Sequence, residues 1–164
     1  MVRIPRRAGY TLVEAMLVVA ILGIIASIGA NILLQVNRYF ILSQARLDVQ
    51  KEARAAMYVM TRNLRQAQSN TILIDRAAGQ PYYSRITFVV NTTTMTFEQQ
   101  GNELIQSVKG GQIPLSKNLQ YIAFTFPRSD DITIVSVSIT LQKQIYQGRS
   151  KALHMASEQV QVMN

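Results

Sequence analysis

The stretch Gly9-Tyr10-Thr11-Leu12-Val13-Glu14, followed by the uncharged run 15–34, decides the fold. The run has 20 residues, eleven of them Leu, Ile or Val. At 1.5 Å per residue, a helix of this length matches a hydrocarbon core of about 30 Å. Arg3, Arg6 and Arg7 precede the run, and basic flanks stay on the cytoplasmic side. The sequence therefore predicts a membrane-spanning helix with its N-terminal end in the cytoplasm.

Three other kinds of N-terminal segment are alternatives for this run. A secretory signal has a shorter apolar region and a small-residue cleavage site after it, and no such site precedes Gln35. The pair Arg6-Arg7 alone is a poor match to a twin-arginine signal. A plain single-pass anchor fits the apolar run but gives no role to Glu14.

Glu14 is the informative residue because it lies at the start of the apolar run. A carboxylate at the centre of a bilayer costs about 2.5–3.5 kcal/mol, so such charges usually have a partner. The N-terminus of a helix offers about half a positive charge, and a free amino group offers a full one. A cut between Gly9 and Tyr10 creates that amino group, with Glu14 as the fifth residue of the new chain.

The same residues resemble the type III signal sequence of type IV prepilins and pseudopilins. The resemblance covers the basic leader, Gly9 before the cut, the aromatic Tyr10, Glu14 at the fifth place and the apolar run. It implies cleavage after Gly9 by the prepilin peptidase and N-methylation of Tyr10. It also implies that Glu14 meets the N-terminus of a neighbouring subunit during filament assembly. Asn31 stands where major pilins often carry a proline, which favours a minor subunit.

The helix is predicted to continue through residues 35–67, which contain no proline or glycine. Apolar residues recur there in steps of three or four and trace one helical face. We expect this stripe to pack against the protein's own sheet, the alternative being a coiled-coil seam. Its members are Leu42, Ala45, Val49, Ala53, Met57, Met60, Leu64 and Ala67.

After Ser69 the apolar pattern changes to a period of two, which is typical of strands. Val135, Val137, Ile139 and Leu141 alternate with small hydroxyl residues and predict a half-buried strand. Strands or parts of strands are also predicted at 71–75, 85–90, 95–98, 103–108, 112–115 and 122–126. A last strand is predicted through Leu153 to Val162, with a bulge around 156–158 where the alternation slips.

The order of a long helix and an antiparallel sheet resembles the J-type minor pseudopilins of type II secretion and the W-type minor pilins. The resemblance includes a hairpin near Asn91 and a final Val-rich strand. It also includes residues 104–106, Leu-Ile-Gln, where those proteins often have Leu-Tyr-Arg. The fold class expected is α+β: a long N-terminal helix, half transmembrane and half amphipathic, followed by an antiparallel β-sheet head.

Composition argues against most catalytic chemistry. The chain has no cysteine and one histidine, His154, so it offers no thiol nucleophile and no multi-histidine metal site. We expect no enzyme activity and no cofactor. Asp130 and Asp131 are a weak calcium candidate, because calcium takes six to eight oxygen ligands and only two carboxylates are present in this loop. Asn91-Thr92-Thr93 fits both a glycosylation acceptor and a hairpin tip.

A nucleic-acid surface is the other site considered. The net charge is +8, and Arg54, Arg62 and Arg65 are the candidates for phosphate contact. They are expected to lack interleaved aromatic residues at the spacing that base stacking favours. A solvated basic surface is the alternative for these residues.

The resulting prediction is a structural subunit, made of a leader (1–9), a transmembrane helix (10–34), an amphipathic extension (35–67) and a β-sheet head (68–164). Its partners would be other pilin or pseudopilin subunits, the prepilin peptidase and the membrane. It would lie in the bacterial inner membrane and then in a periplasmic or surface filament, as a minor tip or initiation subunit. The alternative is a competence-type pseudopilin that contributes to DNA binding and uptake.

Overall fold

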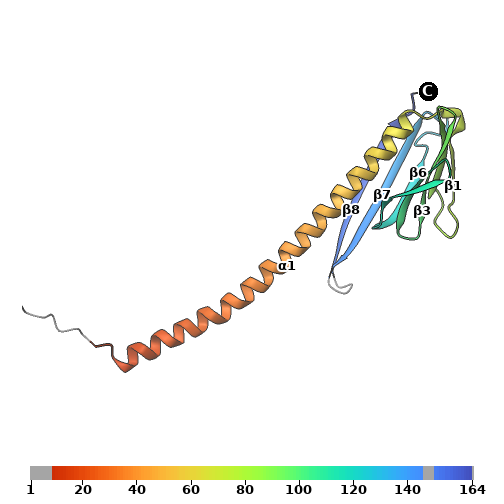
Figure 1. The fold of residues 1–164 in the computed structure, drawn as a ribbon. Helices are drawn as coiled ribbons and strands as arrows, with labels where there is room; N and C mark the ends of the chain where they lie inside the picture. Colours follow the sequence, from red (N-terminus) through yellow and green to blue (C-terminus); the bar gives the residue numbers. More distant parts are fainter. Residues whose placement is uncertain (1–8, 146–149, 164) are drawn as a thin grey trace, which may run out of the picture. The chain divides into compact units, whose positions relative to one another are not determined.

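The computed structural model describes residues 9–145 and 150–163 (Figure 1). One helix, α1 (Leu12–Arg65), is followed by a short 3-10 helix (Ser69–Thr71) and eight strands. Five strands form one antiparallel sheet in chain order: β1 (Leu73–Asp75), β2 (Arg85–Val90), β3 (Thr93–Gln100), β4 (Glu103–Val108) and β5 (Gly111–Ser116). Three form a second antiparallel sheet: β6 (Leu119–Thr125), β7 (Ile134–Ile145) and β8 (Ser150–Gln161). The predicted α+β class, with a long apolar N-terminal helix and antiparallel strands, is confirmed.

The chain divides into two compact units within α1. The first ends at Ile41, and its helical residues expose almost all of their apolar side chains. The second, the globular unit, is Leu42–Asn164. By length and composition, α1 is the one helix in the described part of the chain that could cross a membrane.

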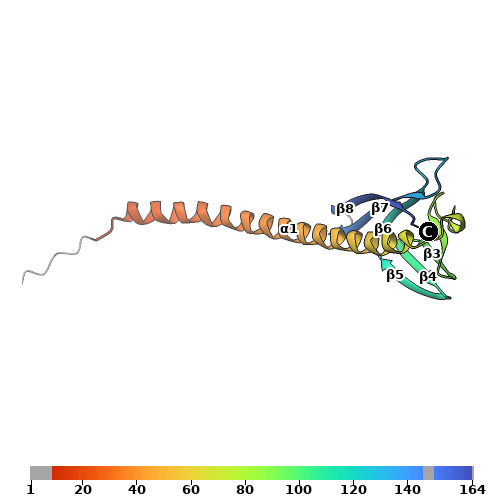
Figure 2. The same cartoon turned by 90° about the horizontal axis from the view of Figure 1, so that it is seen from above.

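The core of the globular unit lies between α1 and the sheets. The predicted stripe is confirmed: Val49, Ala53, Met60 and Leu64 are fully buried, and they pack with strand residues of both sheets. Figure 2 shows this half of α1 between the two sheets, with β6, β7 and β8 on one side and β3, β4 and β5 on the other. The helix therefore covers two sheets at once with one apolar face.

Three buried phenylalanines contribute the largest side chains of this core. Phe88 and Phe97 lie on neighbouring strands with ring centroids 5.8 Å apart, and Phe124 comes from the second sheet. Large aromatic groups account for much of the apolar area that a small core buries. On β7 the predicted alternation is confirmed, with Val135 and Val137 buried between less buried neighbours.

Acidic residues of α1 hold the connection between the sheets. The Glu52 carboxylate accepts hydrogen bonds from the Lys117 backbone N–H (2.9 Å) and from Asn118 Nδ2 (2.7 Å). One helical turn earlier, Asp48 pairs with Lys143 of β7 at 2.9 Å. The helix therefore contacts the point where the chain leaves one sheet and enters the other.

The last strand differs from the prediction in one respect. No bulge occurs at 156–158, because β8 pairs with β7 in unbroken register from Ile134–Gln161 to Ile145–Ser150. The buried residues Ala152 and Val160 keep the same parity, so Leu153 and Met155 lie on the outer face, 55% and 70% exposed. The prediction was wrong because it assumed that every large apolar residue of this strand faces the core.

The hairpin predicted near Asn91 is confirmed, with Asn91 and Thr92 joining β2 to β3. Both have positive φ, 46° and 73°, as the tight turn of a two-residue hairpin requires. A β-branched residue such as Thr92 is rare in this conformation, so the turn is held by the strands beside it.

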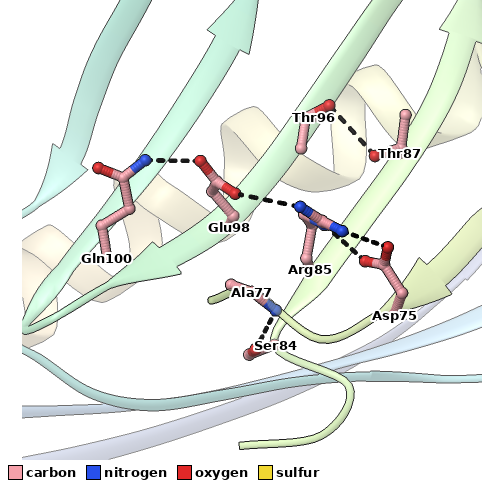
Figure 3. A network of polar contacts seen from close by, with 8 residues as sticks. All are labelled: Asp75, Ala77, Ser84, Arg85, Thr87, Thr96, Glu98 and Gln100. Carbon is pink, nitrogen blue, oxygen red and sulfur yellow. Dashed lines mark hydrogen bonds and ion pairs between the residues drawn. The ribbon is translucent and has the colours of Figure 1, made fainter. Parts of the chain in front are cut away.

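A polar network ties the edge strand β1 to its neighbours (Figure 3). Arg85 donates from Nε to Asp75 Oδ1 (2.6 Å) and also from a terminal nitrogen to Oδ2. Glu98 lies 4.0 Å from the other side of the guanidinium and accepts a hydrogen bond from Gln100. The hydrogen bond from Arg85 lowers the pKa of Asp75, and the arginine charge lowers it further, while partial burial acts in the opposite direction.

The lowered pKa of Asp75 leads to a pH-dependent prediction. A folded-state pKa below the ordinary value of 3.8 means that the pair stabilises the fold fully above 3.8. Its contribution is lost as the pH falls from that value through the lower folded-state pKa. Asp75→Asn should therefore lower the free energy of unfolding near neutral pH by about 1 kcal/mol or less, because the pair is partly exposed.

Thermal melts of the full chain in detergent, at about pH 7 and about pH 3, check this prediction. The difference between wild type and Asp75→Asn should be smaller at the lower pH. Asp130→Asn is the matched control, because Asp130 pairs only with Arg128, at 3.6 Å on an exposed loop, among the described residues. An Asp75→Asn difference of equal size at both pH values would contradict the prediction.

Candidate functional site

The first candidate site is the start of α1. The helix begins at Leu12, directly after Thr11, whose Oγ1 accepts a hydrogen bond from the Glu14 backbone N–H at 3.3 Å. A threonine before the first turn with a glutamate three residues later forms the pattern of a capping box. The sequence analysis missed this role of Thr11, although the spacing of Thr11 and Glu14 indicates it.

Glu14 itself lies in the first turn of α1 and is exposed. A carboxylate there interacts favourably with the positive end of the helix dipole. No ion pair of Glu14 is found within residues 9–145 and 150–163. A new amino terminus at Tyr10 would offer this carboxylate a partner with a full positive charge.

The Gly9–Tyr10 bond lies just outside the helix. Both residues are exposed, and a Cβ added to Gly9 would meet nothing within 4 Å. The fold of the described residues therefore places no steric demand for glycine at position 9. A requirement for glycine there would have to come from an enzyme that binds this segment.

The helix surface that follows is mostly apolar, and residues 15–34 carry no charge. From Leu12 to Phe40 the large apolar side chains are exposed by about half or more, for example Leu17 at 58% and Ile25 at 59%. The polar side chain of Asn31 has a hydrogen-bond partner within the helix, because its Nδ2 donates to the Ser27 carbonyl at 3.2 Å. Such a surface is stable only against lipid or against other apolar helices.

The second candidate site is a groove between α1 and β8 in the globular unit. Its volume is about 760 Å³. Arg54, Arg62 and Arg65, the three arginines singled out in the sequence, all line it from the helix side. Ala156, Ser157, Glu158 and Met163 line it from the strand side. The structure thus brings together residues that are about 90 to 110 positions apart in the chain.

Tyr58 also lines this groove and was missed in the sequence analysis. It stands four residues from Arg54 and four from Arg62, so all three share one helical face. Its side chain is 65% exposed. The expectation that these arginines lack an interleaved aromatic residue was therefore wrong. The four-residue steps from Arg54 to Tyr58 and from Tyr58 to Arg62 could have indicated it in the sequence.

The loop carboxylates have local partners. Asp131 Oδ1 accepts hydrogen bonds from the Thr133 N–H (2.9 Å) and hydroxyl (2.6 Å), and these bonds lower its pKa, the hydroxyl bond most. Asp130 pairs with Arg128. Within the described ranges, no group of three or more His, Asp or Glu residues could hold a metal ion. This geometry is that of a carboxylate-capped turn.

Comparison with known proteins matches only the N-terminus. The family model described as the prokaryotic N-terminal methylation motif matches residues 4–30. This range contains Gly9, Tyr10 and Glu14, together with most of the apolar run. Neither the curated proteins nor the solved structures give a match to the chain. The matched motif, placed at the start of a long apolar helix, supports a type IV pilin-like protein.

Processing at Gly9 is the first prediction from this site. In cells with an active prepilin peptidase, the mature chain should begin at Tyr10 and carry one added methyl group, as measured by intact mass. Gly9→Leu should block cleavage, because the added side chain meets no neighbour in the fold and can act only on recognition by the peptidase.

Ser27→Ala is a suitable control, since it changes the same helix away from the cut and should be processed normally. A wild-type chain that still starts at Met1, or one cut after Leu34, would contradict the prediction.

Proposed function

We propose that this chain is a minor pilin or pseudopilin, a structural subunit of a type IV pilus or of a type II secretion pseudopilus, and not an enzyme. The observation that carries the proposal is the N-terminal methylation motif at residues 4–30, which runs into the first turns of a 54-residue helix. The proposed place is the tip or the initiation complex of the filament.

Membrane insertion comes first in this proposal. The arginines before the apolar run keep the leader in the cytoplasm, and the helix enters the inner membrane. The prepilin peptidase then removes residues 1–9 and leaves Tyr10 as the new N-terminus. The globular unit begins at Leu42, beyond the apolar run. The apolar core of this unit is buried between α1 and the two sheets, so we propose that it folds outside the bilayer.

Filament assembly is the second step of the proposal. The exposed apolar side chains between Leu12 and Phe40 would pack against the corresponding helices of neighbouring subunits. Glu14 would pair with the amino group of a neighbour's Tyr10. In an apolar setting this pair fixes register, because a carboxylate left without its partner is costly.

A minor role is supported by Asn31. Major pilins often have a proline at this place, by the resemblance described above, whereas here α1 continues through Asn31 without interruption. The J-type and W-type resemblance of the head is a further argument for a minor subunit.

Substitution of Glu14 tests the assembly step. Glu14→Leu should insert at least as well as wild type, because a charge leaves the span, and it should still be cleaved at Gly9. Its incorporation into filaments should fall strongly, since an unpaired buried charge costs about 3–5 kcal/mol. Glu14→Asp should be intermediate, because it keeps the charge with a shorter reach.

Immunoblots of sheared filaments, with membrane fractions as the insertion control, measure this outcome. If Glu14→Leu is incorporated like wild type, the charge pair does not drive assembly, or this subunit has no neighbour above it. Crosslinking of the helix to a defined neighbour separates these two results.

Copy number tests the proposed place in the filament. A tip or initiation subunit should be far less abundant in sheared filaments than the main pilin, as measured by quantitative mass spectrometry. Finding this chain as the dominant subunit would contradict the minor role while leaving the pilin-like class intact.

A further inference from the structure

The groove between α1 and β8 has the features of a site for an extended peptide. One wall is the helix face with Arg54, Tyr58 and Arg62, and the other is the strand β8. Ala156, Ser157 and Glu158 are consecutive, and consecutive residues of a strand point to opposite faces. A groove lined by all three therefore runs along the edge of the strand, beside its backbone.

That edge of β8 has no partner strand. The second sheet has the order β6-β7-β8, so among the described residues β8 pairs with β7 alone. In an antiparallel pair, alternate residues direct their N–H and C=O groups away from the partner. An unpaired edge of this kind can accept an added strand.

The charge of the α1 side of the groove indicates which kind of added strand would bind there. Arg54, Arg62 and Arg65 are exposed, and none of them has an ion pair within residues 9–145 and 150–163. Glu158 is the one carboxylate among the residues that line the groove. The excess of positive charge favours an acidic ligand.

Spacing refines this requirement. Arg54 and Arg62 are eight residues apart, about 12 Å along the helix axis. In an extended strand, residues four apart on the same face are separated by about 13 Å. Both views show β8 running lengthwise beside this half of α1 (Figure 1, Figure 2). Acidic residues four apart would therefore meet the two arginines, with the residue between them opposite Tyr58.

We propose that this groove binds an extended acidic segment of a partner protein, which adds to the edge of β8 as a further strand. The segment has acidic residues at positions one and five and an apolar residue at position three, all facing α1. A nucleic acid fits less well, because a single tyrosine offers little base stacking and an unpaired strand edge favours a peptide backbone. The inference rests on the groove alone and does not depend on the proposed filament function.

A binding titration with the full chain in detergent micelles tests the proposal. The probe is a fluorescent peptide, Ser-Thr-Glu-Thr-Val-Thr-Glu-Thr-Ser, followed by fluorescence anisotropy. Three further ligands are compared: the same peptide with Lys in place of Glu, a version with N-methylated backbone amides, and a single-stranded oligonucleotide. The acidic peptide should bind saturably, and the lysine and N-methylated versions should not.

Variants locate the site. Combined Arg54→Ala, Arg62→Ala and Arg65→Ala should weaken peptide binding roughly tenfold or more, because exposed charge pairs contribute modestly but several are lost. Combined Lys51→Ala, Lys117→Ala and Arg128→Ala removes the same charge outside the groove and should leave binding unchanged. Melting curves confirm that both variants are folded.

Several results would overturn the proposal. They are no binding of the acidic peptide, equal binding of the N-methylated version, or equal weakening by both triple variants. Oligonucleotide binding that is lost in the arginine variant, without peptide binding, would assign the groove to nucleic acid instead.

Discussion

The packing of one face of α1 against two sheets is the constraint on which the rest of the globular unit depends. Small residues such as Ala45 and Ala53 let the strands approach the helix, and Met57 and Met60 fill the space between them. Both sheets contribute residues to this single core. The helix must therefore be apolar on one side from Leu42 onward, whereas between Ala15 and Leu34 it carries no charged residue on any side. One continuous helix thus meets two different environments.

Much of this arrangement could be predicted from periodicity. The strands at 85–90 and 103–108 were predicted with the observed bounds, because alternation and turn residues define both ends. The division into two sheets was not predicted, since it depends on contacts such as that of Glu52 with residues 117–118, 65 positions away. The bulge in β8 was predicted wrongly, because local alternation does not show that Leu153 and Met155 remain outside.

The two candidate sites also differ in how far they could be predicted from the sequence. The N-terminal motif is contiguous, so Gly9, Tyr10 and Glu14 could be recognised from sequence, and only the cap formed by Thr11 was missed. The groove is formed by residues far apart in the chain, so sequence could indicate its arginines but not Glu158 or the edge of β8. Tyr58 is an intermediate case. Its four-residue spacing from Arg54 and Arg62 could be seen in the sequence, but only the structure shows that it lines the groove.

The hydrogen bonds of Glu52 and the ion pair of Asp48 have a mechanical consequence. Glu52 holds the link between the sheets, and Asp48 holds Lys143 in the second sheet. Tension applied to α1 is therefore transmitted to both sheets together. Separating the helix from either one requires breaking the shared core, so the globular unit should yield to force as a single body and not strand by strand.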